Sequence, residues 1–164
     1  METTPSWPCE GLNMQIDFPI KRPRAIVGQK VDSTPSTTVS AVSDVPVAFG
    51  ALVVFSEVPS LCHTPKTKEE LLKPLGISLR QYYGLRYEPQ TAISVLRQGR
   101  IWVEDVDAAE AKIAAGEPVF IKLSEGKAIF TSKSKDAFEL KGSIYLEGLV
   151  EAKVPIEINF LGGK

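Results

Sequence analysis

Cys62 and His63 form the one adjacent pair of nucleophile and base in the sequence, so thiol-based hydrolysis is the first chemistry to consider. That chemistry needs a base hydrogen-bonded to the nucleophile, a third group that orients the base, and donors for the oxyanion. Adjacent residues of a strand point to opposite sides, and in a loop their geometry is uncontrolled. No orienting group or oxyanion hole is recognisable, so the sequence disfavours a Cys–His enzyme.

A run of carboxylates is the second candidate, because a hard cation such as Ca²⁺ takes oxygen ligands. The run consists of Glu104, Asp105, Asp107, Glu110 and Glu117. It lacks the acidic spacing and central glycine of a calcium loop, and two of its members are better explained as helix caps. A single histidine in the whole chain excludes most histidine-rich metal sites. We therefore expect no metal and no other cofactor.

Trp102 lies close in sequence to Arg97 and Arg100 and is a candidate for a cation–π contact or a ligand platform. If residues 101 and 103 face the core, strand alternation predicts that Trp102 faces outward. Outward tryptophans are common at protein interfaces and unusual on a solvated monomer. The sequence therefore favours an interface at Arg100 and Trp102 over a small-ligand site.

Three tyrosines cluster at positions 82, 83 and 87 in a turn-rich segment. They are candidates for lining a sugar cleft. Core positions or subunit contacts explain them better, because buried tyrosine usually finds a partner for its hydroxyl.

Composition sets further limits on function. The chain has 164 residues, 43% apolar and 24% charged, which is ordinary for one globular domain. A net charge of −1 gives no field that would gather nucleic acid, and no apolar run approaches a membrane span. The N-terminus lacks the features of a secretory signal, and reduced thiols are the favoured state of Cys9 and Cys62. No GxGxxG, Walker A, HExxH or GxSxG pattern occurs.

The first 44 residues are predicted to form an extended arm, and residues 45–164 a β-barrel-like domain. Within the arm, residues 12–20 alternate with period two, which indicates a half-buried strand. A basic trio, Lys21, Arg22 and Arg24, follows, and residues 32–44 are interpreted as an extended loop. The strand is either an arm that pairs with a neighbouring subunit or the first strand of the local barrel. Its apolar face consists of Leu12, Met14, Ile16, Phe18 and Ile20.

Residues 45–55, VPVAFGALVVF, are apolar on both faces and predict a fully covered central strand, with Gly50 marking a bulge or a close backbone approach. Thr67 and Glu70 have the spacing of a capping box, which predicts a helix of about two turns that Pro74 ends. Residues 75–79 are then expected to resume as a strand.

Residues 92–123 hold the best-marked local signals. Ile93 and Val95 alternate before Gln98-Gly99, and a similar pattern follows it. This pattern predicts a β-hairpin, with one long strand bent by a glycine bulge as the alternative. Asp107 and Gly116 are expected to begin and end a second short helix, and residues 119–123 to form the next strand.

Two longer strands are expected near the end of the chain, around residues 144–150 and 154–160. Together the segments predict a mainly β protein: an antiparallel β-barrel or sandwich with two short helices and an extended N-terminal arm.

The order of four segments resembles the tailed-phage capsid decoration proteins, the structural cement proteins of the gp24-like kind. The segments are FGALVVF at residues 49–55, LGISL at 75–79, SVLRQGRIWV at 94–103 and AGEPVFIKL at 115–123. The resemblance covers residues 45–160, and the order of the segments is more specific than any one of them. The insertion-like helical segment at residues 63–75 and the long N-terminal region depart from the family pattern, which leaves open which surface meets the capsid and how many subunits associate.

The resemblance implies a protein without catalytic residues that binds the outside of the assembled capsid at capsomer junctions. The implied partners are the major capsid protein and further copies of the chain, with a trimer favoured over a dimer; direct binding to nucleic acid or membrane is not expected. The chain would be made in the host cytoplasm and act in the virion. We expect interface residues at Leu12, Met14, Ile16, Phe18, Arg22, Arg24, Arg100 and Trp102. A carbohydrate-binding or other adhesive β module of a virion is the alternative.

Overall fold

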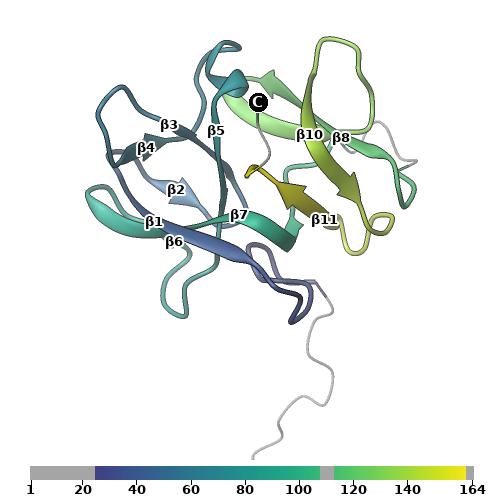
Figure 1. Ribbon diagram of the computed structural model, residues 1–164, viewed down its shortest axis with the longest axis horizontal. Helices are drawn as coiled ribbons and strands as arrows, with labels where there is room; N and C mark the ends of the chain where they lie inside the picture. Colours follow the sequence, from purple (N-terminus) through teal and green to yellow (C-terminus); the bar gives the residue numbers. More distant parts are fainter. Residues whose placement is uncertain (1–24, 108–112, 162–164) are drawn as a thin grey trace, which may run out of the picture.

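Strand β7, Thr91–Val103, pairs with three other strands of the structure (Figure 1). The computed structural model describes residues 25–107 and 113–161, and these residues are mainly β. Before β7 the chain forms β1 (Thr37–Ser43), β2 (Val47–Ala48), β3 (Leu52–Phe55), β4 (Leu61–His63), the 3-10 turn η1 (Glu70–Leu72), β5 (Pro74–Ser78) and β6 (Arg86–Tyr87). After β7 it forms β8 (Pro118–Ser124), β9 (Lys127–Thr131), β10 (Phe138–Tyr145) and β11 (Val154–Asn159).

The first half of β7 closes a five-strand barrel in the order β1-β4-β3-β5-β7, with β7 paired back to β1. β1 lies antiparallel along residues 91–98 of β7, and β5 pairs with the other edge of β7 at Val95 and Leu96. Because β1 and β4 are parallel, the barrel is mixed, and the expectation of a wholly antiparallel one is wrong at this pair. The barrel encloses a core of nine buried residues: Ala41, Val47, Phe49, Val53, Cys62, Leu75, Tyr87, Ile93 and Val95.

The second half of β7 belongs to a different part of the sheet. β11 pairs with it from Val103 to Gln98, and β10, β8 and β9 follow in that order. The other edge is covered by residues 28–31: the Gly28 amide donates to the Trp102 carbonyl oxygen at 2.8 Å, and the Trp102 amide donates to the Gln29 carbonyl oxygen at 3.0 Å. Each half of β7 therefore has a hydrogen-bonded neighbour along both of its edges.

A bend between these halves divides the side chains of β7 between two cores. Ile93 and Val95 lie in the barrel core, whereas Leu96, Ile101 and Val103 lie in a second core with β8, β9, β10 and β11. In a regular strand, Leu96 and Ile101 would point to opposite faces. The pairing with β1 shifts register between Thr37 and Thr38, and Gly99 has a φ of 135°. The predicted hairpin at Gln98-Gly99 is therefore wrong, and the alternative of one bent strand is confirmed.

Gly50 ends one strand and allows the next, so the prediction of a single strand over residues 45–55 is also wrong. β2 pairs with β6 in a small separate sheet, and β3 pairs with β4 and β5. Between them Gly50 has a φ of 71°, a backbone conformation that residues with a Cβ rarely adopt. A Cβ there would lie 2.7 Å from Val27 Cγ1, so the expected close approach is confirmed.

The capping-box contacts predicted at Thr67 form, but the helix does not continue. The Glu70 amide donates to Thr67 Oγ1 at 3.4 Å, and Glu70 Oε2 accepts from the Thr67 amide at 3.3 Å. Only the single 3-10 turn η1 follows, because Pro74 already begins β5 and pairs with Val54. Among the described residues no helix reaches seven residues. The second predicted helix falls largely on residues 108–112, which lie outside the described residues.

Residues 32–44 are not the loop that their composition suggests. Seven of them form β1, which has the most extensive ladder with β7. The strand predicted at residues 12–20 lies outside the described residues, and the division of the chain at residue 44 stays a prediction. The strands expected at residues 75–79, 119–123 and 154–160 are confirmed as β5, β8 and β11 within one or two residues at each end.

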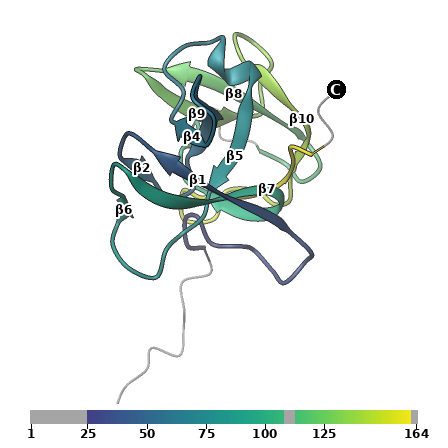
Figure 2. The same ribbon diagram turned by 60° about the vertical axis from the view of Figure 1, so that its left-hand side comes forward.

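The loop between β5 and β6 and the helical turn η1 lie at opposite ends of the molecule. In Figures 1 and 2 the start of the described chain and the loop between β5 and β6 lie at the lower end. The single helical turn before β5 lies at the upper end in both views.

We predict that Gly76→Ala breaks the pairing between β5 and β7. A Cβ at Gly76 would lie 2.3 Å from the Leu96 carbonyl oxygen, which belongs to the strand backbone and cannot give way cheaply. The loss in free energy of unfolding should be about 2–4 kcal/mol, measured by urea denaturation.

Gly116→Ala is the matched control, because Gly116 has a φ of 86° but nothing within 4 Å of the added Cβ. It should lose only about 1–2 kcal/mol from the backbone conformation. Equal losses for the two variants would contradict the pairing described here.

Candidate interaction surfaces

Cys62 and His63 do not form a catalytic pair. Cys62 is fully buried inside the barrel, where its Sγ lies 3.5 Å from the Val42 carbonyl oxygen. Burial, with a smaller contribution from Asp44, raises the pKa of the thiol to about 11. The His63 imidazole is turned toward Glu70, with Nε2 3.4 Å from the carboxylate. The thiol is therefore protonated and enclosed, which disfavours nucleophilic chemistry as the sequence did.

The acidic run is spread over ion pairs and turns. Asp105 pairs with Lys127 and Asp107 with Lys122, each across to the β8–β9 hairpin. Glu117 Oε2 accepts from the Ala114 amide at 3.1 Å. Within residues 25–107 and 113–161, no three histidine, cysteine or acidic side chains are grouped so that they could hold a metal ion.

Trp102 does not face outward, so that expectation is wrong. The side chain is only 5% exposed, and Ile101 and Val103 beside it are fully buried. Alternation fails here because β7 is covered on both faces at this point, as burial of three consecutive residues requires. A tryptophan enclosed in its own subunit offers almost no surface to a partner.

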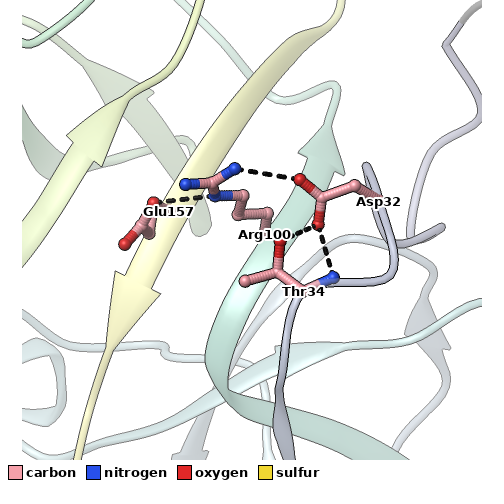
Figure 3. A network of polar contacts seen from close by, with 4 residues as sticks. All are labelled: Asp32, Thr34, Arg100 and Glu157. Atoms are coloured by element: carbon pink, nitrogen blue, oxygen red, sulfur yellow. Dashed lines mark hydrogen bonds and ion pairs between the residues drawn. The ribbon is translucent and has the colours of Figure 1, made fainter.

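Arg100 is partly exposed and is held by two carboxylates of its own chain (Figure 3). Its Nε donates to Glu157 Oε2 on β11 at 2.8 Å, and its NH1 nitrogen donates to Asp32 Oδ2 at 2.9 Å. These bonds raise the pKa of the guanidinium. Hydrogen bonds from the hydroxyl and amide of Thr34, followed by Arg100, lower the pKa of Asp32. Arg100 thus fastens the segment before β1 across β7 and β11.

The three tyrosines separate into one buried and two exposed residues. Tyr87 is buried against Phe49, with ring centroids 5.4 Å apart, and its hydroxyl donates to the Leu79 carbonyl oxygen at 2.8 Å. Tyr82 is 93% exposed and packs edge-on against Tyr83, with centroids 4.9 Å apart. The three rings therefore do not line one sugar cleft. Tyr87 has the core role that the sequence favoured.

Sequence reasoning missed Leu85, in the same loop between β5 and β6 as Tyr82 and Tyr83, which is 88% exposed. It also missed a groove that lies between the start of the described chain and Leu79 to Tyr82. At the upper end, Phe55 and Leu72 are exposed although strand and helix patterns predict that they are covered. No sequence pattern marks these positions, because exposure depends on which elements pack over them.

Leu12, Met14, Ile16, Phe18, Arg22 and Arg24, the expected interface residues of the N-terminal segment, lie outside the described residues. Their role stays a prediction. In the described part of the chain no helix is long and apolar enough to cross a membrane.

We predict that Asp32→Asn lowers the melting temperature at neutral pH by a small amount. A folded-state pKa below the ordinary 3.8 means that the ionised carboxylate stabilises the fold above that pH. The contribution is lost as the pH falls through the folded-state pKa. The difference between wild type and variant should therefore vanish in acid, as followed by thermal melts across pH.

The control for this series is Asp136→Asn, which changes an exposed aspartate outside the network. A wild-type advantage over Asp32→Asn that persists unchanged below pH 3.8 would contradict the network as described.

We further predict that Cys62 resists alkylation in the native protein. In a Cys9→Ser background at pH 8, a pKa of about 11 leaves roughly one thiol in a thousand ionised, and burial blocks access as well. Labelling with iodoacetamide, followed by mass spectrometry, should be at least ~100-fold slower than in denaturant. Fast labelling of the folded chain would show that the thiol is available for chemistry.

Comparison with known proteins identifies the family. A family model described as "Structural cement protein (E217 gp24/Pam3 gp6)" matches residues 14–159. Among solved structures, the chain is similar to a chain of the capsid of Myoviridae Phage XM1, with a TM-score of 0.67 and 16% identity, over 90% of this chain and 98% of that one. No curated protein matches the sequence. The chain therefore belongs to the phage structural cement proteins, the capsid decoration proteins of the virion.

Proposed function

We propose that this cement protein binds the outer surface of the assembled capsid at the junctions between capsomers. Packaged DNA exerts a pressure that pulls capsomers apart. A protein that spans a junction adds buried interface, and symmetry repeats that contribution at every equivalent position. Even interfaces of modest individual strength then hold firmly, because binding at several points raises the effective affinity.

The observation that carries this proposal is the exposed loop between β5 and β6. Tyr82, Tyr83 and Leu85 project from it with most of their surface open to solvent. Tyrosine is enriched among residues that dominate binding energy, and clustered exposed apolar side chains mark interaction sites. We assign this loop to the capsid contact.

The base of the loop is fixed to the barrel, which supports its use as a preformed contact. The Arg80 amide donates to the Gly28 carbonyl oxygen at 2.7 Å, and the Arg80 guanidinium lies 5.3 Å from the centre of the Phe49 ring. Tyr87, at the other end of the loop, is buried in the barrel core. A loop anchored at both ends loses little conformational freedom on binding.

Self-association is part of the proposal. A cyclic oligomer presents several such loops at once, and a trimer matches the three-fold and quasi-three-fold positions that capsids offer. Native mass spectrometry of the free protein tests the number of copies.

We predict that the double variant Tyr82→Ala/Leu85→Ala weakens binding to purified capsids by about 10- to 100-fold. Removal of anchor residues of this kind costs about 2 kcal/mol or more. Binding is measured by sedimentation of capsids with increasing amounts of protein. Capsids carrying the variant should also release DNA at a lower temperature than capsids carrying the wild type.

Val58→Ala is the control, since Val58 is an exposed apolar residue in another turn, with 54% of its surface exposed. It should bind as the wild type does. Full capsid occupancy by the double variant would reject the loop as the contact. Binding of both proteins to glycans but not to capsids would favour the adhesive module instead.

A further inference from the structure

A groove of about 910 Å³ lies at the upper end of the molecule, between the corner of η1 and β5 on one side and β10 on the other. Its walls are largely apolar, and Arg97 is among the residues that line it. The lining of the groove includes Phe55, Leu72, Arg97, Phe138, Leu140 and Phe160.

The apolar rim of the groove is exposed to solvent. Leu72 is 65% exposed and Phe55 about half exposed, although both are large apolar side chains. Single exposed apolar residues are normal on a protein surface, but two of them beside an apolar groove mark a binding site.

One wall of the groove includes a strand edge without a neighbour among the described residues. β10 pairs with β8 on one side, and on the other side it pairs with β11 only through Ile144 and Tyr145. A Cβ at Gly142 would lie 3.6 Å from Asn159, the last residue of β11, so residues 138–141 extend past the end of that strand. An open strand edge is a template for an added strand.

Arg97, which lines the groove, carries one hydrogen-bond donor that has no acceptor among the described residues. Its NH2 nitrogen donates to the Phe160 carbonyl oxygen at 3.3 Å. Its Nε is buried and has no hydrogen-bond partner among the described residues. A buried donor without an acceptor is costly, and an incoming strand brings backbone carbonyl oxygens that would accept this bond.

We propose that the groove receives residues 12–20 of a second copy of this chain as an added β-strand. Leu12, Met14, Ile16 and Phe18 alternate with polar residues, as a strand with one buried face requires. The family match begins at residue 14, so residues 14–20 of this segment belong to the part of the chain that the family shares. The inference names the contact behind the proposed self-association and does not depend on how the capsid is bound.

Chain length favours a second copy over the chain's own groove. Four residues, 21–24, connect the segment to Ala25, and the five steps between residues 20 and 25 span at most roughly 18 Å. A domain of this size is roughly 35–40 Å across. The described chain starts at the lower end, and the helical turn that lines the groove lies at the upper end (Figures 1 and 2). A neighbouring groove is therefore the accessible one.

Charge supports the same pairing. The groove is lined by Lys73, Arg97 and Lys141 against one acid, Glu139. Within residues 12–20 the single charged residue is an acid, Asp17. Asp17 is therefore the one charge of the segment that can pair with a cation at the rim of the groove.

The test joins two chains that each carry one added cysteine, both in the Cys9→Ser background. One chain carries Ile16→Cys in the segment, and the other carries Lys141→Cys beside the open edge of β10. A short bismaleimide is added to the mixture, free in solution and bound to capsids, and the products are separated by mass. We expect a cross-linked pair that contains one chain of each kind. Replacing Lys141→Cys by Val58→Cys, at an exposed residue that does not line the groove, should abolish it.

Variants of the two faces give a second measurement. Ile16→Asp in the segment and Leu72→Asp in the groove should each raise the dissociation constant for self-association at least about tenfold in analytical ultracentrifugation. Val58→Asp, the matched control, should leave it unchanged, and circular dichroism verifies folding.

Three outcomes would overturn the proposal: no cross-link between chains in either setting, an equal yield of cross-link when Val58→Cys replaces Lys141→Cys, or self-association unaffected by Ile16→Asp. Each can occur while the wild type still binds capsids, so a failure of this inference is distinct from a failure of the proposed function.

Discussion

The sharing of β7 between two pairing systems is the constraint on which the rest of the structure depends. Its first half completes a five-strand barrel, and its second half carries β11 and, through it, β10, β8 and β9. Because one continuous strand serves both, the two hydrophobic cores cannot move apart without breaking its ladders. The bend near Gly99 lets side chains on one strand enter both cores. A rigid body with two distinct ends follows from this arrangement.

That rigidity suits a protein that acts as structural cement. The buried thiol, the His63–Glu70 contact and the Arg100 network all lie within the subunit and stabilise it. Exposed apolar side chains include those of the tyrosine loop at one end and of the rim of the groove at the other. A fixed distance between these two proposed binding surfaces suits a clamp, since the bound partners are then held at a defined separation.

Alternation in the sequence predicted the strands that bury one continuous face, such as β11 with Val154, Ile156 and Ile158. It failed at β1, whose threonines and serines give little apolar signal although β-branched residues favour strands. It failed again at Trp102, where cover on both faces overrides the period of two. The family was predictable because its segments and their order can be read directly from the sequence, without knowledge of which segments touch. The loop and the groove were not, because both depend on contacts between distant parts of the chain.

The most direct test of the account is a cryo-electron microscopy reconstruction of capsids saturated with this protein, compared with bare capsids. If the protein binds as proposed, density for the barrel is added on the outer surface at junctions between capsomers, with the loop at Tyr82 against the capsid. Each groove then holds a strand that continues into a neighbouring copy. Density over the centres of capsomers alone, with no copy in contact with another, would contradict it.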